Sequence, residues 1–173
     1  MSDKYDALKL SNQLCFPLYA CSKEIVKKYK PYLDKIDLTY TQYIVMMVLW
    51  EQTQLSVKQL GELLYLDSGT LTPVLKKLEQ KGYLNRERSK EDERVLLVTL
   101  TKNGKDLKEE AVDIPMKMGE CISLDAEEAK LLYKLLYKFS PPTLSLSVKT
   151  LSGYKAFAVS NDFLWSSLII SSP

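Results

Sequence analysis

The chain has 173 residues, of which 46% are hydrophobic, enough for one packed domain with or without an appendage. Its 24 basic and 22 acidic residues leave a formal net charge of +2, so a nucleic-acid-binding surface would need locally gathered charge. The absence of histidine excludes His-dependent catalytic triads and the usual His-containing zinc sites.

The first predicted element is a helix over residues 11–30, where apolar side chains recur at helical spacing. Pro31 discourages its continuation. Thr39 and Gln42 then have the form of a capping box, in which each residue bonds the other's backbone N–H. We therefore expect a second, strongly apolar helix to begin there.

Two further helices are predicted after it. Ser56 and Gln59 repeat the capping pattern and open a short helix that ends near residue 64. Asp67 or Ser68 is expected to cap the next helix, which runs to residue 81 and stops at Gly82.

The spacing then changes to that of strands over residues 83–88 and 95–100, with a polar hairpin tip over residues 89–93. Three helices followed by a strand, a charged hairpin and a second strand are the order of a winged helix-turn-helix. We predict a mainly α fold with a small β-hairpin, and a DNA-binding lobe over about residues 39–100.

The remainder of the chain is predicted to be helical and then irregular. Thr101 is expected to cap a helix in which Gly104 is a weak spot and Pro115 a kink. A last helix is predicted over residues 125–139. Residues 140–173 form an atypical tail, rich in serine and opening with two prolines, to which the sequence assigns no role.

The three cysteines are Cys15, Cys21 and Cys121, and none forms a C-x-x-C pair of the kind found in zinc ribbons and thioredoxin-like sites. The N-terminus lacks a secretory apolar segment, and no apolar run approaches the roughly 20 residues that span a bilayer. We therefore expect a cytoplasmic protein with free thiols, and no metal, cofactor or membrane partner.

Side chains suited to DNA lie on the fourth helix and on the hairpin. The helix opens with small hydroxyl side chains at the positive end of its dipole, which suits phosphates and base edges. Residues 66–105 hold nine Lys or Arg against six Asp or Glu, a modest excess that also fits a solvated helix face and a polar turn. The predicted DNA-binding residues are Asp67, Ser68, Gly69, Thr70, Thr72, Lys76, Lys77, Arg86, Arg88, Lys90, Asp92 and Arg94.

Three short motifs resemble those of the MarR family of regulators. They are the wing motif DER at residues 92–94, the recognition-helix start LDSGTLTP at residues 66–73, and NQLCF at residues 12–16. Together with Tyr19, Tyr29 and Tyr40, the last motif resembles the subgroup of organic hydroperoxide repressors and the related staphylococcal thiol regulators. The similarity covers roughly residues 8–139.

The resemblance implies a transcriptional repressor rather than an enzyme, with a winged-helix domain over residues 1–139. It implies a homodimer whose helices at about residues 8–30 and 102–139 interlock. The partner would be double-stranded, pseudo-palindromic operator DNA, with the fourth helix in the major groove. Arg94 would enter the minor groove, its guanidinium oriented by Asp92.

The resemblance also implies that Cys15 is the redox-sensing thiol, oxidised by an organic hydroperoxide. The hydroxyls of Tyr29 and Tyr40 would activate it across the dimer, with Tyr19 as a weaker candidate. From the sequence alone, Cys15 lies near the start of a helix, where the dipole favours negative charge, although a lone Cys on an apolar helix face is usually inert. Cys21 is too far along the helix to bridge Cys15 and is expected in the core.

Cys121 lies where two-cysteine members of the subgroup carry a second thiol, which resolves the oxidised cysteine of the other subunit. One-cysteine members instead form mixed disulfides with small thiols, and both routes stay open at this stage. Three other functions also stay open. They are a repressor released by a small aromatic ligand, a thiol peroxidase, and a broader redox-responsive virulence or biofilm regulator.

Overall fold

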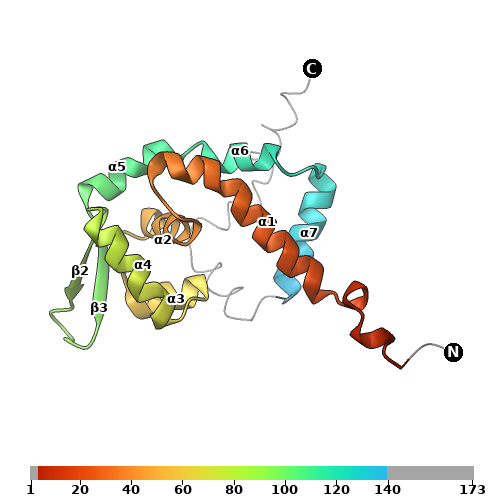
Figure 1. The fold of residues 1–173 in the computed structure, drawn as a ribbon. Helices are drawn as coiled ribbons and strands as arrows, with labels where there is room; N and C mark the ends of the chain where they lie inside the picture. The colour runs from red at the N-terminus through yellow and green to blue at the C-terminus, as the bar shows by residue number, and fades with distance from the viewer. Residues whose placement is uncertain (1–3, 140–173) are drawn as a thin grey trace, which may run out of the picture.

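The computed structural model describes residues 4–139, which form helices and one three-stranded antiparallel sheet, so the predicted fold class is confirmed (Figure 1). The predicted tail over residues 140–173 lies outside the described residues. The helices and strands are α1 (Cys15–Leu33), α2 (Tyr40–Glu51), β1 (Gln54–Ser56), α3 (Val57–Leu64), α4 (Ser68–Gln80), β2 (Leu84–Arg88), β3 (Leu96–Leu100), α5 (Lys102–Ala111), α6 (Ile114–Glu120) and α7 (Ala126–Phe139). Short 3-10 turns are η1 (Asp6–Leu8), η2 (Leu10–Asn12) and η3 (Asp34–Ile36).

Local capping fixes where the helices of the lobe begin. Both predicted capping boxes are present: the Thr39 hydroxyl accepts the backbone N–H of Gln42 at 3.3 Å, and the Ser56 hydroxyl accepts that of Gln59 at 3.2 Å. In each box the glutamine side chain accepts the N–H of the capping residue. At the start of α4 the capping residue is Asp67.

The first helix differs from its predicted range. It begins at Cys15 and continues through Pro31 to Leu33. The last turn persists because Leu33 is buried in the core, and because the N–H of Asp34 bonds the Lys30 carbonyl and completes the turn. Pro31 has no N–H to give the Lys27 carbonyl, and the burial of Leu33 offsets that loss.

A third strand, β1, was not predicted. It lies at one edge of the sheet, whose strand order is β1-β3-β2, and pairs Leu55 with Val98 of the central strand. Three residues are too few to show the alternation that identifies a strand from sequence. The β2–β3 hairpin, residues 84–100, is called the wing below.

One continuous core holds the lobe together. The inward faces of α2, α3 and α4 meet the sheet there, and the side chains of Leu49, Leu60, Leu78, Leu84 and Val98 are fully buried. The core extends to α5 and α6 through Leu107, Ala111, Ile114 and Met118. In Figure 1, α7 and the N-terminal half of α1 lie at the far side of the molecule from the wing. Within residues 4–139 no helix is both long and apolar enough to cross a bilayer.

The wing meets α5 and α2 at a tightly packed junction, formed by Gly82, Tyr83, Thr101, Gly104 and Trp50. The Thr101 hydroxyl donates to the Gly82 carbonyl at 2.6 Å and accepts the N–H of Gly104 at 3.1 Å. The Trp50 indole N–H donates to the Gly104 carbonyl at 2.8 Å. A Cβ built on Gly104 would lie 1.9 Å from the Tyr83 carbonyl oxygen. The prediction of Gly104 as a weak spot is therefore wrong, because close packing requires glycine there.

Removing the Thr101 hydroxyl is expected to destabilise this junction. Thr101→Val keeps the shape of the side chain and loses both hydrogen bonds, so the free energy of unfolding should fall by about 1–2 kcal/mol. Urea denaturation measures the change. Thr72→Val is the matched control, since Thr72 is exposed and makes no side-chain hydrogen bond within residues 4–139. Equal losses in the two variants would contradict the assigned role.

The predicted kink at Pro115 is an interruption of the helix. α5 ends at Ala111, and α6 begins at Ile114 with Pro115 in its first turn, where a missing N–H costs nothing. The last predicted helix is confirmed as α7, and Asp125 caps it by accepting the N–H of Glu128 at 2.8 Å.

Candidate DNA-binding surface and thiol sites

The start of α4 presents the polar groups that the sequence predicted for DNA. Asp67 accepts both the N–H and the hydroxyl of Thr70, at 2.9 and 3.0 Å, and these hydrogen bonds hold the pKa of Asp67 below its usual value. The opposite face of the helix is buried in the core. The outward face exposes Ser68, Gly69, Thr70, Thr72, Lys76 and Lys77.

The wing tip is held by its own short hydrogen bonds. The Ser89 hydroxyl accepts the N–H groups of Glu91 and Asp92, and the Asp92 carboxylate accepts the backbone N–H of Arg94 at 2.9 Å. The prediction that Asp92 orients the Arg94 guanidinium is therefore corrected. A carboxylate two residues away closes the turn through the backbone and leaves the guanidinium without a partner within residues 4–139.

The other two wing arginines differ in their surroundings. The Arg88 guanidinium is exposed and donates to the Glu93 carbonyl at 2.9 Å. The Arg86 guanidinium instead forms an ion pair with Glu79 of α4 at 2.5 Å, and its side chain is only 18% exposed. Arg86 is therefore held by a carboxylate within the protein, whereas Arg88 donates only to a backbone carbonyl. Within residues 4–139, Lys90 and Arg94 form no ion pair.

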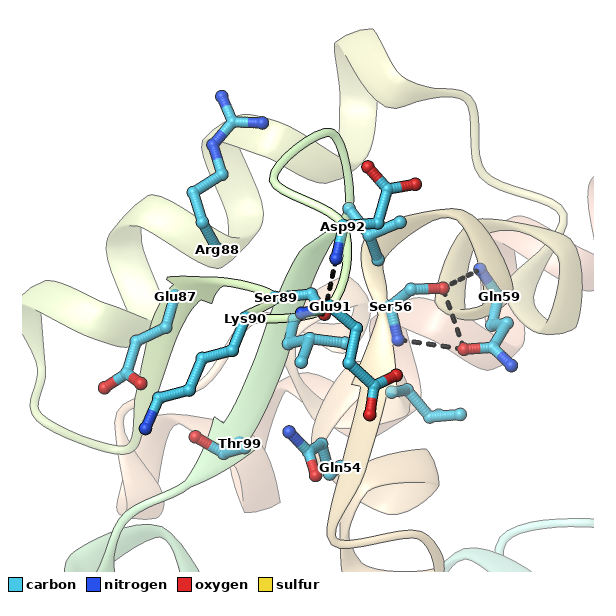
Figure 2. Close-up of a pocket in the computed structure, with 13 residues that line it drawn as sticks. Gln54, Ser56, Gln59, Glu87, Arg88, Ser89, Lys90, Glu91, Asp92 and Thr99 are labelled. Carbon is cyan, nitrogen blue, oxygen red and sulfur yellow. Dashed lines mark hydrogen bonds between the residues drawn. The ribbon is translucent and has the colours of Figure 1, made fainter.

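A hollow of about 720 Å³ lies between the wing and the edge strand β1 (Figure 2). Gln54, Ser56 and Gln59 line one side, and Ser56 and Gln59 are held there by the capping box at the start of α3. The charged residues that line it are Glu87, Arg88, Lys90, Glu91 and Asp92. Because both signs are represented, the hollow does not concentrate positive charge.

The three thiols occupy different surroundings. Cys15 is the first residue of α1 and is exposed, with no hydrogen-bond partner in the part of the chain that the structure describes. Cys21 is also exposed, so its predicted place in the core is wrong, and several apolar side chains beside it on α1, among them Leu18 and Ile25, are exposed as well. Cys121 is half-buried, with its Sγ 3.6 Å from the Tyr32 hydroxyl.

Two of the predicted thiol-activating tyrosines, Tyr29 and Tyr40, lie apart from Cys15. Tyr29 and Tyr40 stack with ring centroids 4.9 Å apart and pack against the core, next to Tyr43. Burial raises the pKa of both hydroxyls, so both stay protonated and able to donate near neutral pH. Tyr19 is 57% exposed, with the Lys23 ammonium over its ring.

The contact between Tyr32 and Cys121 was not predicted. The two residues are 89 positions apart, so no local spacing pairs them. The hydrogen bond with Cys121 raises the pKa of Tyr32.

No group of His, Cys, Asp or Glu among residues 4–139 is arranged to hold a metal ion.

A core of three helices, a recognition helix with a free polar face and a charged hairpin together define a winged helix-turn-helix of the DNA-binding type. A family model described as transcriptional regulator SarA/Rot matches residues 27–111. The organic hydroperoxide resistance transcriptional regulator of Bacillus subtilis (strain 168) is 53% identical over 137 residues, which cover 79% of this chain and 93% of the relative.

Solved structures agree with this similarity. Reduced AbfR bound to DNA has a TM-score of 0.64 and 37% identity, covering 79% of this chain and 94% of that one. Disulfide-formed AbfR has a TM-score of 0.54 and 37% identity, covering 78% of this chain and 96% of that one. A further similar structure is that of AbfR of Staphylococcus epidermidis. A cysteine-to-serine mutant of E. coli MarR complexed with operator DNA has a TM-score of 0.67 and 25% identity, covering 81% and 100%.

The chain therefore belongs to the MarR family of transcriptional regulators, in the group that includes the organic hydroperoxide resistance regulator. Its DNA-binding class and fold confirm the resemblance stated from the sequence motifs.

Proposed function

We propose that this regulator is a homodimeric repressor that releases its operator when an organic hydroperoxide oxidises Cys15. The observation that carries the proposal is an exposed thiol at the first residue of α1, in a chain 53% identical to an organic hydroperoxide resistance regulator.

Exposed apolar side chains on two helices support the dimer. Large apolar side chains remain exposed along α1 and α7, an arrangement typical of a surface that a protein partner covers. They are Leu14, Phe16, Leu18, Tyr19, Ile25 and Val26 near or on α1, and Leu131, Leu132, Tyr133, Leu135, Leu136 and Phe139 on α7. Both sets fall within the helices at about residues 8–30 and 102–139 proposed for dimerisation, and we assign a second copy of the chain as their cover.

A dimer also supplies what Cys15 lacks in the single chain. Cys15 and Tyr29 are fourteen residues apart on α1, a rise of about 21 Å, so they do not meet within one subunit. In the proposed dimer, the hydroxyls of Tyr29 and Tyr40 donate to the Cys15 sulfur of the other subunit. Tyr19, which is exposed on the same helix, lies close enough in sequence to contribute from the same side.

The proposed chemistry needs only the thiolate and the hydroperoxide. The Cys15 sulfur attacks one peroxide oxygen, so that an S–O bond forms as the O–O bond breaks and the alcohol leaves after taking up a proton. The Cys121 thiolate of the other subunit then attacks the sulfenic sulfur, forming a disulfide and releasing water. The sulfur is oxidised and the hydroperoxide is reduced.

The proposed DNA contacts follow the exposed polar groups. The outward face of α4 enters the major groove, and Arg94 enters the minor groove, where narrow A·T-rich DNA attracts a guanidinium. Arg88 and Lys90 contact phosphates. Asp67 acts by capping α4, and Asp92 by shaping the wing tip. We leave Arg86 out of the contacts because Glu79 occupies its guanidinium.

The test is operator binding before and after oxidation. A duplex selected by the reduced protein from a random-sequence library is the probe, and fluorescence anisotropy measures affinity before and after one equivalent of cumene hydroperoxide. We expect tight binding by the reduced protein and release after treatment. Binding of equal strength before and after would refute the redox switch.

Cys121→Ser is expected to change the oxidised product. The oxidised wild-type protein should migrate as a covalent dimer on a non-reducing gel, because the two thiols belong to different subunits. The variant should remain monomeric there and instead take up an added small thiol as a mixed disulfide. Intact-mass measurement distinguishes the two products. A covalent dimer in the Cys121→Ser variant would rule out Cys121 as the second thiol.

A second candidate function is release by a small aromatic ligand. It is favoured by a largely apolar hollow of about 290 Å³ between α2 and α5, lined by Tyr43, Met47 and Trp50 and edged by Lys108. The same anisotropy assay discriminates the two functions. Salicylate would release the reduced protein from DNA in the ligand-responsive case, and would leave it bound in the redox case.

A further inference from the structure

One carboxylate joins the recognition helix to the wing by three hydrogen bonds. Glu79 lies in the last turn of α4, and Arg86 in the middle of β2. Glu79 Oε2 accepts from the Arg86 Nη2 and Nε groups, at 2.5 and 3.1 Å. Glu79 Oε1 accepts the backbone N–H of Arg86, also at 3.1 Å. The carboxylate therefore holds both the side chain and the main chain of the strand.

This ion pair is unlike most others in the described residues. Six of the eight ion pairs within residues 4–139 link residues three or four positions apart and so brace a single stretch of chain. The remaining two are Arg86 with Glu79 and Lys81 with Asp37, and both begin at the end of α4. Only the first reaches the wing.

The surroundings of the pair favour a fixed geometry. The Arg86 side chain is 18% exposed and that of Glu79 is 36% exposed, so the arginine is largely shielded from solvent and the carboxylate partly. Hydrogen bonds from the Arg86 side chain lower the pKa of Glu79 and keep the carboxylate ionised at neutral pH. Charge-assisted bonds that share one planar guanidinium fix direction as well as distance.

We propose that Glu79 is a positioning residue for DNA recognition: it fixes the wing at the angle to α4 that lets Arg94 and the recognition helix engage the same half-site. The inference rests on the proposed placement of Arg94 in the minor groove. Without the bonds between Glu79 and Arg86, the wing is attached to the lobe only through the sheet and the junction. The wing then adopts a range of orientations, and Arg94 reaches the minor groove in only a fraction of them. The energy of the Arg94 contact therefore depends on Glu79, although Glu79 does not touch DNA.

A double-mutant cycle on DNA binding tests this dependence. Wild type, Arg94→Ala, Glu79→Ala and the double variant are compared on the library-selected duplex, using reduced protein throughout. We expect Arg94→Ala to weaken binding about tenfold or more in the wild-type background, and less than about twofold in the Glu79→Ala background. Glu79→Gln retains an acceptor for the Arg86 backbone N–H, so in this background Arg94→Ala should weaken binding by an intermediate amount. If the Glu79→Ala protein does not fold, the Glu79→Gln background provides the test.

Lys81→Ala is the matched control, since it removes the ion pair with Asp37 at the same end of α4 and leaves the wing untouched. In that background Arg94→Ala should weaken DNA binding by the same factor as in wild type. If Arg94→Ala still weakens binding tenfold in both Glu79 variants, Glu79 does not position the wing, although Arg94 still contacts DNA. An Arg94→Ala change without effect in wild type would overturn the proposed wing contact and this inference with it.

Discussion

Cys15→Ser protein is expected to stay on its operator after a hydroperoxide treatment that weakens binding by the wild-type protein about 10- to 100-fold. Serine keeps the size of the side chain, but its hydroxyl is not ionised near neutral pH and does not attack the peroxide bond. Anisotropy on the selected duplex measures binding, and intact mass measures whether oxygen has been added. The reduced variant should bind as tightly as reduced wild type, because Cys15 is the first residue of α1, and the N-terminal half of α1 lies at the far side of the molecule from the wing (Figure 1).

Cys21→Ser is the sharpest control for this prediction. Cys21 lies on the same helix, six residues further on, and is also exposed in the single chain. It lies inside the helix rather than at its first residue, so it lacks the free backbone N–H groups at the positive end of the dipole. The Cys21→Ser protein should respond as wild type does. If it stays bound while Cys15→Ser is released, the sensing thiol is Cys21.

Gly104→Ala is expected to lower the free energy of unfolding by about 3 kcal/mol or more, the largest stability effect that the structure indicates. The added methyl would lie 1.9 Å from the Tyr83 carbonyl oxygen and 3.1 Å from the Leu100 side chain. A backbone carbonyl does not turn aside as a flexible side chain would, so the start of β2 or of α5 has to move. Moving either strains the Trp50 and Thr101 hydrogen bonds.

Thermal and urea denaturation measure this loss, and the melting temperature should fall by about 10 °C. Asn103→Ala, an exposed change on the same turn, should leave the midpoint within a degree or two of wild type, about the scale of an ordinary surface substitution. A Gly104→Ala protein with an unchanged midpoint would mean that the junction is not closely packed.

What could be predicted from sequence was local. Thr39 and Ser56 were identified as caps because each is followed three positions later by a glutamine that can complete a capping box. Gly82 was identified as a stop because glycine readily adopts the left-handed conformation after a helix, and its φ of 76° agrees. The wing followed from a change in spacing, and the family followed from short contiguous motifs. In each case the evidence lay within a few residues of the feature.

What could not be predicted depends on residues distant in the sequence or on the partner subunit. The contact between Tyr32 and Cys121 spans 89 positions, and Trp50 meets Gly104 across 54. Arg86 is a basic residue on the wing and so is of the type that contacts DNA. Its ion pair with Glu79 forms only because β2 packs against α4. Cys21 was assigned to the core because its helix is apolar, but apolar side chains along that part of α1 are exposed among the described residues.

The junction also sets how far the wing moves when the helices beside it move. Trp50 and Thr101 bond to the backbone of Gly104, the Tyr83 carbonyl lies close against it, and Thr101 also bonds to Gly82, so these contacts join α5 to the base of the wing. The five residues of β3 extend about 17 Å from this base, so a tilt of about 10° carries the far end about 3 Å. That is close to the rise of one base pair, about 3.4 Å. If the junction tilted by that amount, the far end of the wing would shift by about the spacing of one base pair.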